Sequence, residues 1–132
     1  WWDSHAEYRY DLVLAERERR DEITDLERQW EVEIIAPFTD TWGRRHPART
    51  LRADFRYVEV STGFTFIDDV KGMVTRDAAL RWELAQSLYS ECKDMRWRLI
   101  DNETLAPVGT RTVALVGKGV TGDVREMCGG GA

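Results

Sequence analysis

The sequence is poor in the features that mark membrane proteins, disulfide scaffolds and zinc sites. Only two cysteines occur, Cys92 and Cys128, and they stand far apart with no Cys-x-x-Cys or Cys/His grouping. The apolar runs are too short to span a bilayer, and no basic stretch followed by an apolar one indicates a signal peptide. We therefore expect a cytoplasmic protein with no membrane partner.

The chain also lacks the basic excess that is typical of nucleic-acid binders, since its formal net charge is −5. The distribution of charge is more informative than the sum. Between residues 44 and 56 a single acid, Asp54, stands among five arginines, which are Arg44, Arg45, Arg49, Arg52 and Arg56. These arginines are candidates for binding phosphates in a sequence-independent, salt-sensitive way. The alternative is that they solvate a long loop and pair with the acids of "ERERRDE".

The length of 132 residues and a hydrophobic fraction of 42% predict one globular domain over residues 1–132. Its core is expected at about residues 4–100. Residues 101–132 are expected to form a C-terminal extension that is partly loop or disordered, with a further strand around residues 111–117.

A charged helix is predicted from Ser4 to about Arg20. Tyr8, Leu12 and Ala15 recur at helical spacing, and these are the side chains expected to face the core. Ser4 and the glutamate three residues later, Glu7, fit a Ser-x-x-Glu capping box. The box alone explains this glutamate.

Three strands, a helix and a fourth strand follow. The strands are predicted at residues 31–36, 51–60, 64–72 and 95–100, with a polar loop over residues 39–50 and a turn at residues 61–63 that makes a hairpin. The second helix is predicted over residues 76–93, with Ala79, Leu80, Leu84, Leu88 and Tyr89 on its buried face. Because a helix between strands makes a crossover, the last strand should lie parallel to the third. The fold class is thus α/β, or more closely α+β with a mixed sheet, in the order αβββαβ.

The stretch "FIDDVKG" places two aspartates in a strand, where aspartate is depleted. Alternation puts Asp69 and Lys71 on one face, whereas Asp68 points the other way and is expected to face solvent or cap a helix instead of binding a metal. Asp54, on the preceding strand, leaves the sheet opposite Phe55. If the hairpin register brings Asp54 beside Asp69, the two carboxylates and the lysine form a divalent-metal site.

Such a cluster suits phosphodiester hydrolysis. Mg²⁺, or Mn²⁺ in its place, is held by one or two carboxylates together with waters and substrate phosphate. It activates water, neutralises the charge that builds on the phosphate and assists the leaving oxygen. A lysine beside the ion can orient the attacking water or stabilise the developing negative charge.

Four segments together carry a resemblance to a known family. "SHAE" opens the first helix, "LERQ" precedes the first strand, "RADF" lies on the second strand and "DDVKG" on the third. This pattern resembles a small phage-encoded family of the PD-(D/E)XK nuclease superfamily, and it covers about residues 4–100. The resemblance implies a restriction-endonuclease-like core of mixed sheet flanked by helices, and metal-dependent cleavage of nucleic acid in the host cytoplasm.

Transferred residue by residue, the resemblance implies roles for five positions. Asp54 is the central metal ligand, Asp69 the second, and the backbone carbonyl of Val70 contributes a third donor. Lys71 is the superfamily's lysine and Glu7 its helical acid. Two departures, His5 where the family commonly has lysine and Trp30 where it has proline, remove no metal ligand. The resemblance also implies Holliday-junction-like branched DNA as substrate and a homodimer.

Simpler interpretations remain for each residue. Asp54 is also explained by pairing with Arg52 or Arg56, and the pair of Asp69 and Lys71 by an exposed ion pair worth well under about 1 kcal/mol.

Several further residues have weaker claims. Gln29 is interpreted as structural, Trp42 is the one tryptophan with a fair claim to stack on a base, and Thr75 and Arg76 are candidate phosphate contacts at the start of the second helix. Two alternative functions stand beside the resolvase, a restriction- or transposition-associated nuclease and a non-catalytic nucleic-acid-binding scaffold of the same fold.

Overall fold

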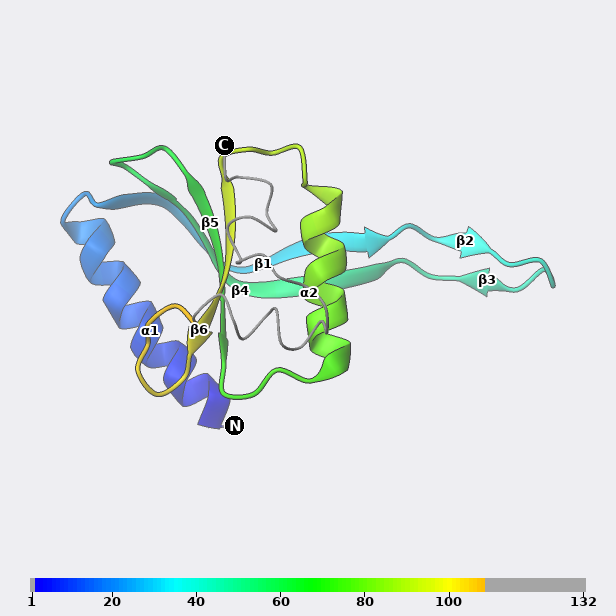
Figure 1. The fold of residues 1–132 in the computed structure, drawn as a ribbon, viewed down its shortest axis with the longest axis horizontal. Coiled ribbons are helices and arrows are strands. Elements are labelled where there is room, and N and C mark those ends of the chain that lie inside the picture. Colours follow the sequence, from blue (N-terminus) through cyan, green and yellow to red (C-terminus); the bar gives the residue numbers. More distant parts are fainter. Residues whose placement is uncertain (1, 109–132) are drawn as a thin grey trace.

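The computed structural model describes residues 2–108, with side chains from residue 5 onward. A sheet separates two helices, with α1 on one face and α2 on the other (Figure 1). The elements are α1 (Trp2–Arg19), β1 (Ile23–Ile35), β2 (Phe38–Thr39), β3 (Arg45–His46), β4 (Arg49–Glu59), β5 (Thr65–Lys71), α2 (Arg76–Leu88) and β6 (Met95–Asp101).

The sheet has the order β1-β4-β5-β6 and is mixed. Strand β4 is antiparallel to both β1 and β5, whereas β6 runs parallel to β5. The turn before β5 is closed by Gly63 at φ 76 and by Thr62, whose hydroxyl accepts a hydrogen bond from Phe64 N at 3.1 Å. The predicted α+β class, with an antiparallel hairpin and a parallel last strand, is therefore confirmed.

The N-terminal helix differs from its prediction in two ways. It begins at Trp2, so Ser4 lies inside the helix and the predicted N-cap is wrong. Its buried side chains are Ala6, Tyr10 and Leu14, whereas the predicted core residues Tyr8 and Leu12 are exposed. The charged helix has only a weak apolar stripe, so counting aliphatic residues could not select its buried face.

Helix α2 begins as predicted, with Thr75 as N-cap accepting a hydrogen bond from Ala78 N at 3.1 Å. It ends at Leu88, earlier than predicted, and buries Trp82, Ala85 and Gln86, whereas the predicted Leu80 and Leu88 are exposed. The largest ring on the helix takes the core position because it packs edge-on against Trp97, with ring centroids 5.3 Å apart.

Strand β1 is 13 residues long and starts eight residues before the predicted strand. Its pairing with β4 is interrupted by register shifts, and Gln29 adopts a left-handed backbone conformation with φ 56. A left-handed residue of this kind bends a strand locally, and the side chains that follow it can change to the opposite face of the sheet. Ala53 packs in the cluster beneath α2, while Phe55, two residues later on β4, packs in the cluster beneath α1. Simple alternation therefore fails at Asp54, which lies between them.

The polar loop predicted over residues 39–50 is largely a two-stranded arm. Strands β2 and β3 pair antiparallel, with Phe38 opposite His46 and Thr39 opposite Arg45. The arm continues the β1–β4 hairpin and projects from the body of the molecule past α2 (Figure 1). Prediction failed here because a strand pair of two residues each is too short to show alternation.

The segment after β6 folds back on the sheet as far as the structure describes it. Val108 N donates to Leu99 O at 2.7 Å, and Pro107 bridges Ile100. The strand predicted around residues 111–117 lies outside the described residues. Within the described part of the chain, neither helix has the length and apolar character needed to cross a membrane.

Candidate active site

Asp54 and Asp69 lie opposite each other where β4 and β5 separate. The recorded pairing of these strands ends with Phe55 opposite Asp68, and the same register makes Asp54 and Asp69 the next pair. Asp54 N donates to Asp69 Oδ1 at 3.1 Å, and Val70 N donates to Asp54 Oδ2 at 2.8 Å. At this point the two carboxylates accept the hydrogen bonds of backbone amides on the opposite strand, in place of backbone carbonyls. The register that the metal-site prediction required is present.

Lys71 belongs to the same group. Its Nζ lies 3.3 Å from Asp69 Oδ2, and the lysine side chain is partly exposed while Asp69 is only 5% exposed. The predicted common face of these two residues is therefore confirmed. The pair is more than an exposed surface ion pair because the carboxylate is buried.

Glu7 reaches the group from α1. Its Oε2 accepts a hydrogen bond of 2.7 Å from Gln29 Nε2 on β1. Burial and, after it, the negative charge of Asp54 together raise the pKa of Glu7 to about 7, while the hydrogen bond from Gln29 acts in the opposite direction. Glu7 therefore lies next to Asp54 in a partly buried position, and its carboxylate is held by Gln29 instead of capping the helix.

Burial likewise raises the pKa of Asp69 to about 7, with Asp54 adding to the rise and Lys71 opposing it. Three carboxylates share one ammonium group, so the fully ionised cluster has two uncompensated negative charges. Like charges held this close raise one another's pKa unless a cation compensates them.

The donor set suits a hard divalent cation because it consists of carboxylate oxygens, together with the backbone of Val70 between them. Val70 is buried, and its amide is engaged by Asp54. Within residues 2–108, however, no three His, Cys, Asp or Glu side chains are arranged so that they could hold a metal ion. Asp54 and Asp69 each direct one oxygen to a backbone amide, so binding an ion requires these carboxylates to turn.

Asp68 was expected to face solvent, and this prediction is wrong. The residue points away from Asp69, as expected, but it is completely buried beneath α1. Its carboxylate accepts hydrogen bonds from Tyr10 Oη and Tyr57 Oη, both at 2.6 Å, and from Arg98 Nε at 3.0 Å. A buried carboxylate is tolerable only when it is paired and hydrogen-bonded, and the partners here come from three different elements.

This network anchors α1 to the sheet. Burial raises the pKa of both tyrosines, and the Asp68 charge adds to that rise, so the phenols remain protonated donors. Burial alone would lower the pKa of Arg98, but its hydrogen bonds and charge interaction with Asp68 outweigh burial and raise the pKa. Tyr10 lies three residues after Glu7 on α1, so the network also positions the glutamate.

A cavity of about 280 Å³ adjoins Asp69 and Lys71 on the α2 side of the sheet. Arg52 and Arg81 bring further positive charge to its wall, and Trp82 provides part of its apolar lining. Of the five arginines predicted to bind phosphate, Arg52 lines this cavity, where it also pairs with Glu31 at 3.1 Å. Arg81 is a cavity residue that no sequence pattern indicated.

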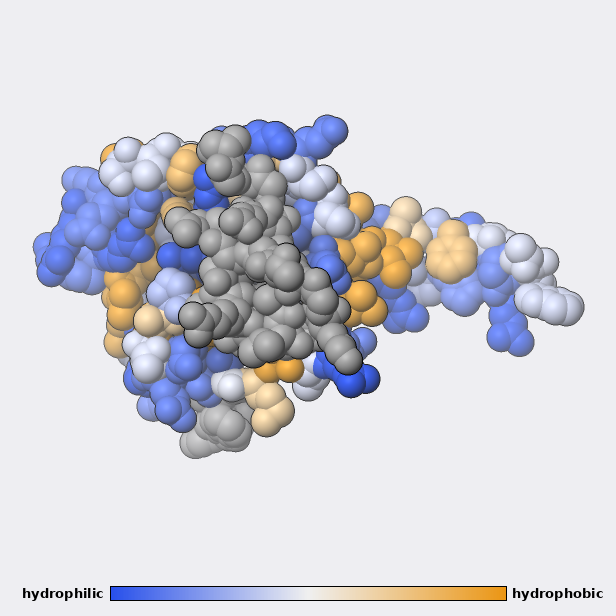
Figure 2. All heavy atoms as spheres, in the orientation of Figure 1, coloured by the Kyte–Doolittle hydropathy of each residue, from blue (hydrophilic) through white to orange (hydrophobic). Residues whose placement is uncertain are grey.

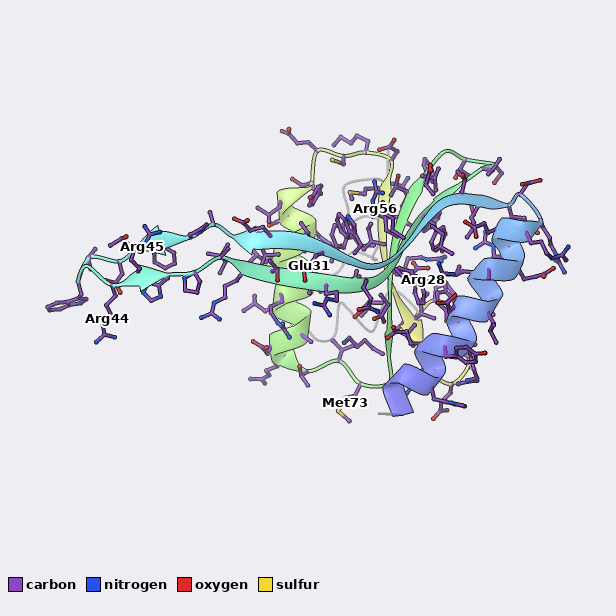
Figure 3. The ribbon with its side chains drawn as sticks, turned by 180° about the vertical axis from the view of Figure 1, so that it is seen from behind. Arg28, Glu31, Arg44, Arg45, Arg56 and Met73 are labelled. Atoms are coloured by element: carbon purple, nitrogen blue, oxygen red, sulfur yellow. The ribbon has the colours of Figure 1, made fainter. Side chains whose placement is uncertain are left out.

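The other predicted phosphate-binding residues are more distant. Arg44 and Arg45 lie on the arm, away from the two helices, while Arg56 lies near the centre of the sheet (Figure 3). Arg56 pairs with Glu27 at 2.7 Å and lies over the ring of Trp30. The arginine-rich segment therefore does not form one patch beside the carboxylates.

The remaining residues predicted to contact phosphate are exposed, but they make no contact with the carboxylate group that the structure describes. Arg49 begins β4 at the base of the arm, and Arg76 begins α2. The hydroxyl of Thr75 is engaged in capping α2, which leaves its predicted phosphate contact without direct support.

Comparison with known proteins places the chain in a family. A family described as "Protein of unknown function (DUF1064)" matches residues 1–100, and the chain belongs to it. The match covers both helices and the whole four-stranded sheet except the last residue of β6. No curated protein matches the chain. No solved structure matches it either.

Proposed function

We propose that this protein is a metal-dependent DNA endonuclease of the PD-(D/E)XK type. The observation that carries the proposal is the juxtaposition of Asp54 and Asp69 at the point where β4 and β5 separate, with Lys71 beside Asp69. The four sequence segments that resemble the superfamily supply the side chains of this one group, since Glu7 and Gln29 come from "SHAE" and "LERQ" and are hydrogen-bonded to each other.

Asp54, Asp69 and Glu7 would hold the divalent cation, with Mg²⁺ as the expected ion and Mn²⁺ as a substitute. When bound, the cation supplies Lewis-acid activation of water and neutralises charge on the phosphate. The Lys71 ammonium is held by Asp69, and from this position it can orient the attacking water or stabilise negative charge that develops on the phosphate.

The adjacent cavity supports a phosphate-bearing substrate. Its wall carries the cationic side chains of Arg52, Lys71 and Arg81 together with the acids Glu31 and Asp69, so the cations outnumber the acids by three to two. Contacts to phosphate fix the position of a nucleic acid without reading its sequence. Branched DNA as the preferred substrate and a homodimeric enzyme follow from the family resemblance, which implies a two-fold enzyme that cuts two strands symmetrically.

The test is to incubate the protein with a four-way junction, a nicked duplex and a linear duplex, each with Mg²⁺ and with EDTA. We expect symmetric nicking of the junction and of neither duplex, and only in the presence of Mg²⁺. Asp69→Asn and Asp54→Asn should reduce the rate by at least about 100-fold while DNA binding persists, because each change removes a cation ligand.

Asp21→Asn is the matched control, since Asp21 is an exposed aspartate just after α1 and has no part in the group. Its rate should equal that of wild type. Absence of cleavage by wild type, or undiminished cleavage by Asp69→Asn, would refute the catalytic proposal. DNA binding without any cleavage would instead favour the non-catalytic scaffold.

A further inference from the structure

The arm formed by residues 38–46 has an ordered tip. Asp40 Oδ1 accepts hydrogen bonds from Trp42 N and Arg44 N, both at 2.9 Å, and Asp40 N donates to Arg44 O at 2.8 Å. The turn also needs Gly43, whose φ of 84 lies in the left-handed region. One aspartate thus organises the whole turn, and the side chain of Trp42 is presented from a defined backbone.

The sides of the arm are braced as well. Asp40 Oδ2 lies 2.8 Å from His46 Nε2, and the His46 ring stacks on Phe38 with centroids 4.6 Å apart and planes 10° apart. The only acid of the segment between β1 and β4 is therefore occupied within the arm. Figure 2 shows hydrophobic residues at the base of the arm, beside α2, and mainly hydrophilic ones towards its tip.

Trp42 is 90% exposed. Trp82 and Trp97 are buried in the core, and Trp30 is partly buried against it. Within residues 5–108, these three tryptophans therefore contribute to packing, in contrast to Trp42. A ring that stays in water contributes almost no burial energy, and packing within this chain does not account for its position. The indole face is available to another molecule.

The charge of the arm favours a polyanion as that molecule. Arg44 and Arg45 follow the tryptophan after Gly43, and Figure 3 shows both on the arm beyond α2. Arg44 is exposed, and the guanidinium of Arg45 has only a long contact of 3.4 Å to Thr39. An exposed aromatic ring beside two arginines is the combination with which proteins bind bases and their neighbouring phosphates.

We propose that the arm is a second DNA contact, in which Trp42 stacks on an open base face while Arg44 and Arg45 bind the flanking phosphates. This inference rests on the proposed function for the identity of the polymer. In continuous duplex both faces of each base are covered by neighbouring bases, so the indole can stack only at a branch point, an end or a single strand. The arm thereby favours branched over continuous DNA.

The arm also sets a distance between this contact and the cleavage site. Thr50 and Arg52 line the cavity beside Asp69, and the tip is about six residues of extended chain away from Thr50. At about 3.3 Å per strand residue the separation is about 20 Å. That distance corresponds to about six nucleotides along one strand.

The experiment measures binding in EDTA, where no cleavage occurs, by fluorescence anisotropy with a labelled four-way junction, a single strand and a hairpin-capped duplex without open ends. Trp42→Ala should weaken binding to the first two by about ten-fold or more and leave the capped duplex nearly unchanged. Trp42→Phe should keep most of the affinity because it preserves an aromatic face. Arg44→Ala/Arg45→Ala should weaken binding to all three DNAs and reduce the salt dependence of the dissociation constant.

Leu88→Ala is the control, since Leu88 is a large exposed side chain at the far end of α2. Equal affinities of Trp42→Ala and wild type, or an equal loss on the capped duplex, would overturn the inference while cleavage by wild type left the proposed function intact. A change in oligomeric mass of Trp42→Ala by light scattering, with unchanged DNA affinity, would overturn it in favour of an interface between copies. Failure of wild type to bind any DNA would refute the proposed function itself.

Discussion

The side-chain amide of Gln29 donates a hydrogen bond of 2.7 Å to Glu7 Oε2 and so joins β1 to α1 at the edge of the candidate site. Gln29 sits in a left-handed backbone conformation at the bend of β1. Interpreted from sequence as merely structural, it holds the one acid of the group that comes from a helix. The contact can be tested by replacing the amide with a carboxylate and then exchanging the two side chains.

Gln29→Glu should destabilise the protein by about 1–3 kcal/mol at pH 8, because it replaces a hydrogen bond to a carboxylate with a like charge. The loss should be smaller at pH 5, where one of the two carboxyls takes up a proton. The double variant Glu7→Gln/Gln29→Glu restores one amide and one carboxylate, so it should regain most of the stability. Urea unfolding at both pH values measures this, and a loss that is independent of pH and not rescued by the second change would contradict the assignment.

The raised pKa values of Glu7 and Asp69 predict a falling stability between pH 4 and pH 8. The pKa values of both carboxyl groups rise from ordinary values near 4 to about 7 in the folded protein. The folded state therefore holds protons that the unfolded state has released. This contribution to stability is complete below about pH 4 and is lost as the pH rises through 7.

The melting temperature of wild type should accordingly decline from pH 5 to pH 8, and Asp69→Asn should show a shallower decline. Asp21→Asn, the exposed control, should keep the wild-type slope. Under the proposed function, MgCl₂ should raise the melting temperature more at pH 8 than at pH 5, because ionised carboxylates bind the cation. NaCl of equal ionic strength should not reproduce this difference; if it does, the stabilisation is general screening.

The Asp68 network predicts large and unequal losses of stability. Asp68→Ala leaves the partly buried guanidinium of Arg98 and two buried tyrosine hydroxyls without their carboxylate and should cost about 3 kcal/mol. Tyr10→Phe removes one buried hydrogen bond and should cost about 1–3 kcal/mol. Asp77→Ala breaks only the exposed pair with Arg81 and should cost less than about 1 kcal/mol. Equal values for Asp68→Ala and Asp77→Ala in urea unfolding would show that the network is unimportant.

A side chain at Gly72 would meet the side chain of Asn102. A Cβ at this position would lie 2.4 Å from Asn102 Nδ2, in the turn that follows β6. Gly72→Ala should therefore lower the melting temperature by a few degrees at most, since the Asn102 side chain must turn aside. Asn102→Gly removes the obstructing amide, so the double variant should be more stable than Gly72→Ala alone. An unchanged melting temperature in Gly72→Ala would show that the turn adapts freely.

Prediction from sequence succeeded where the pattern was local. The alternation of "LRADFRYVEV" and "FTFIDDVKG", with a short turn between them, was enough to predict an antiparallel hairpin, and the helix after it implied a parallel last strand. Alternation also placed Asp69 and Lys71 on one face correctly. These features depend on neighbouring residues and on a period of two.

The misplaced residues depend on what packs against each element. Asp68 was expected to face solvent or to cap a helix, because it points away from the metal-site face of its strand. Its partners Tyr10 and Arg98 lie 58 and 30 residues away. Tyr8 and Leu12 were expected in the core because they are apolar, yet the helix turned its opposite face to the sheet.

The sequence by itself determined the class of fold, the order of the two helices and the four strands of the main sheet, and the carboxylates and lysine of the candidate site, because residue type and spacing carry that information. Only the tertiary structure decided that β1 and β4 bend at Gln29 and Asp54, that α1 delivers Glu7 to the same place and that Asp68 is buried. A left-handed residue and a carboxylate network between distant residues produce no periodic pattern in the sequence. They exist because packing and buried charge must be satisfied together in three dimensions.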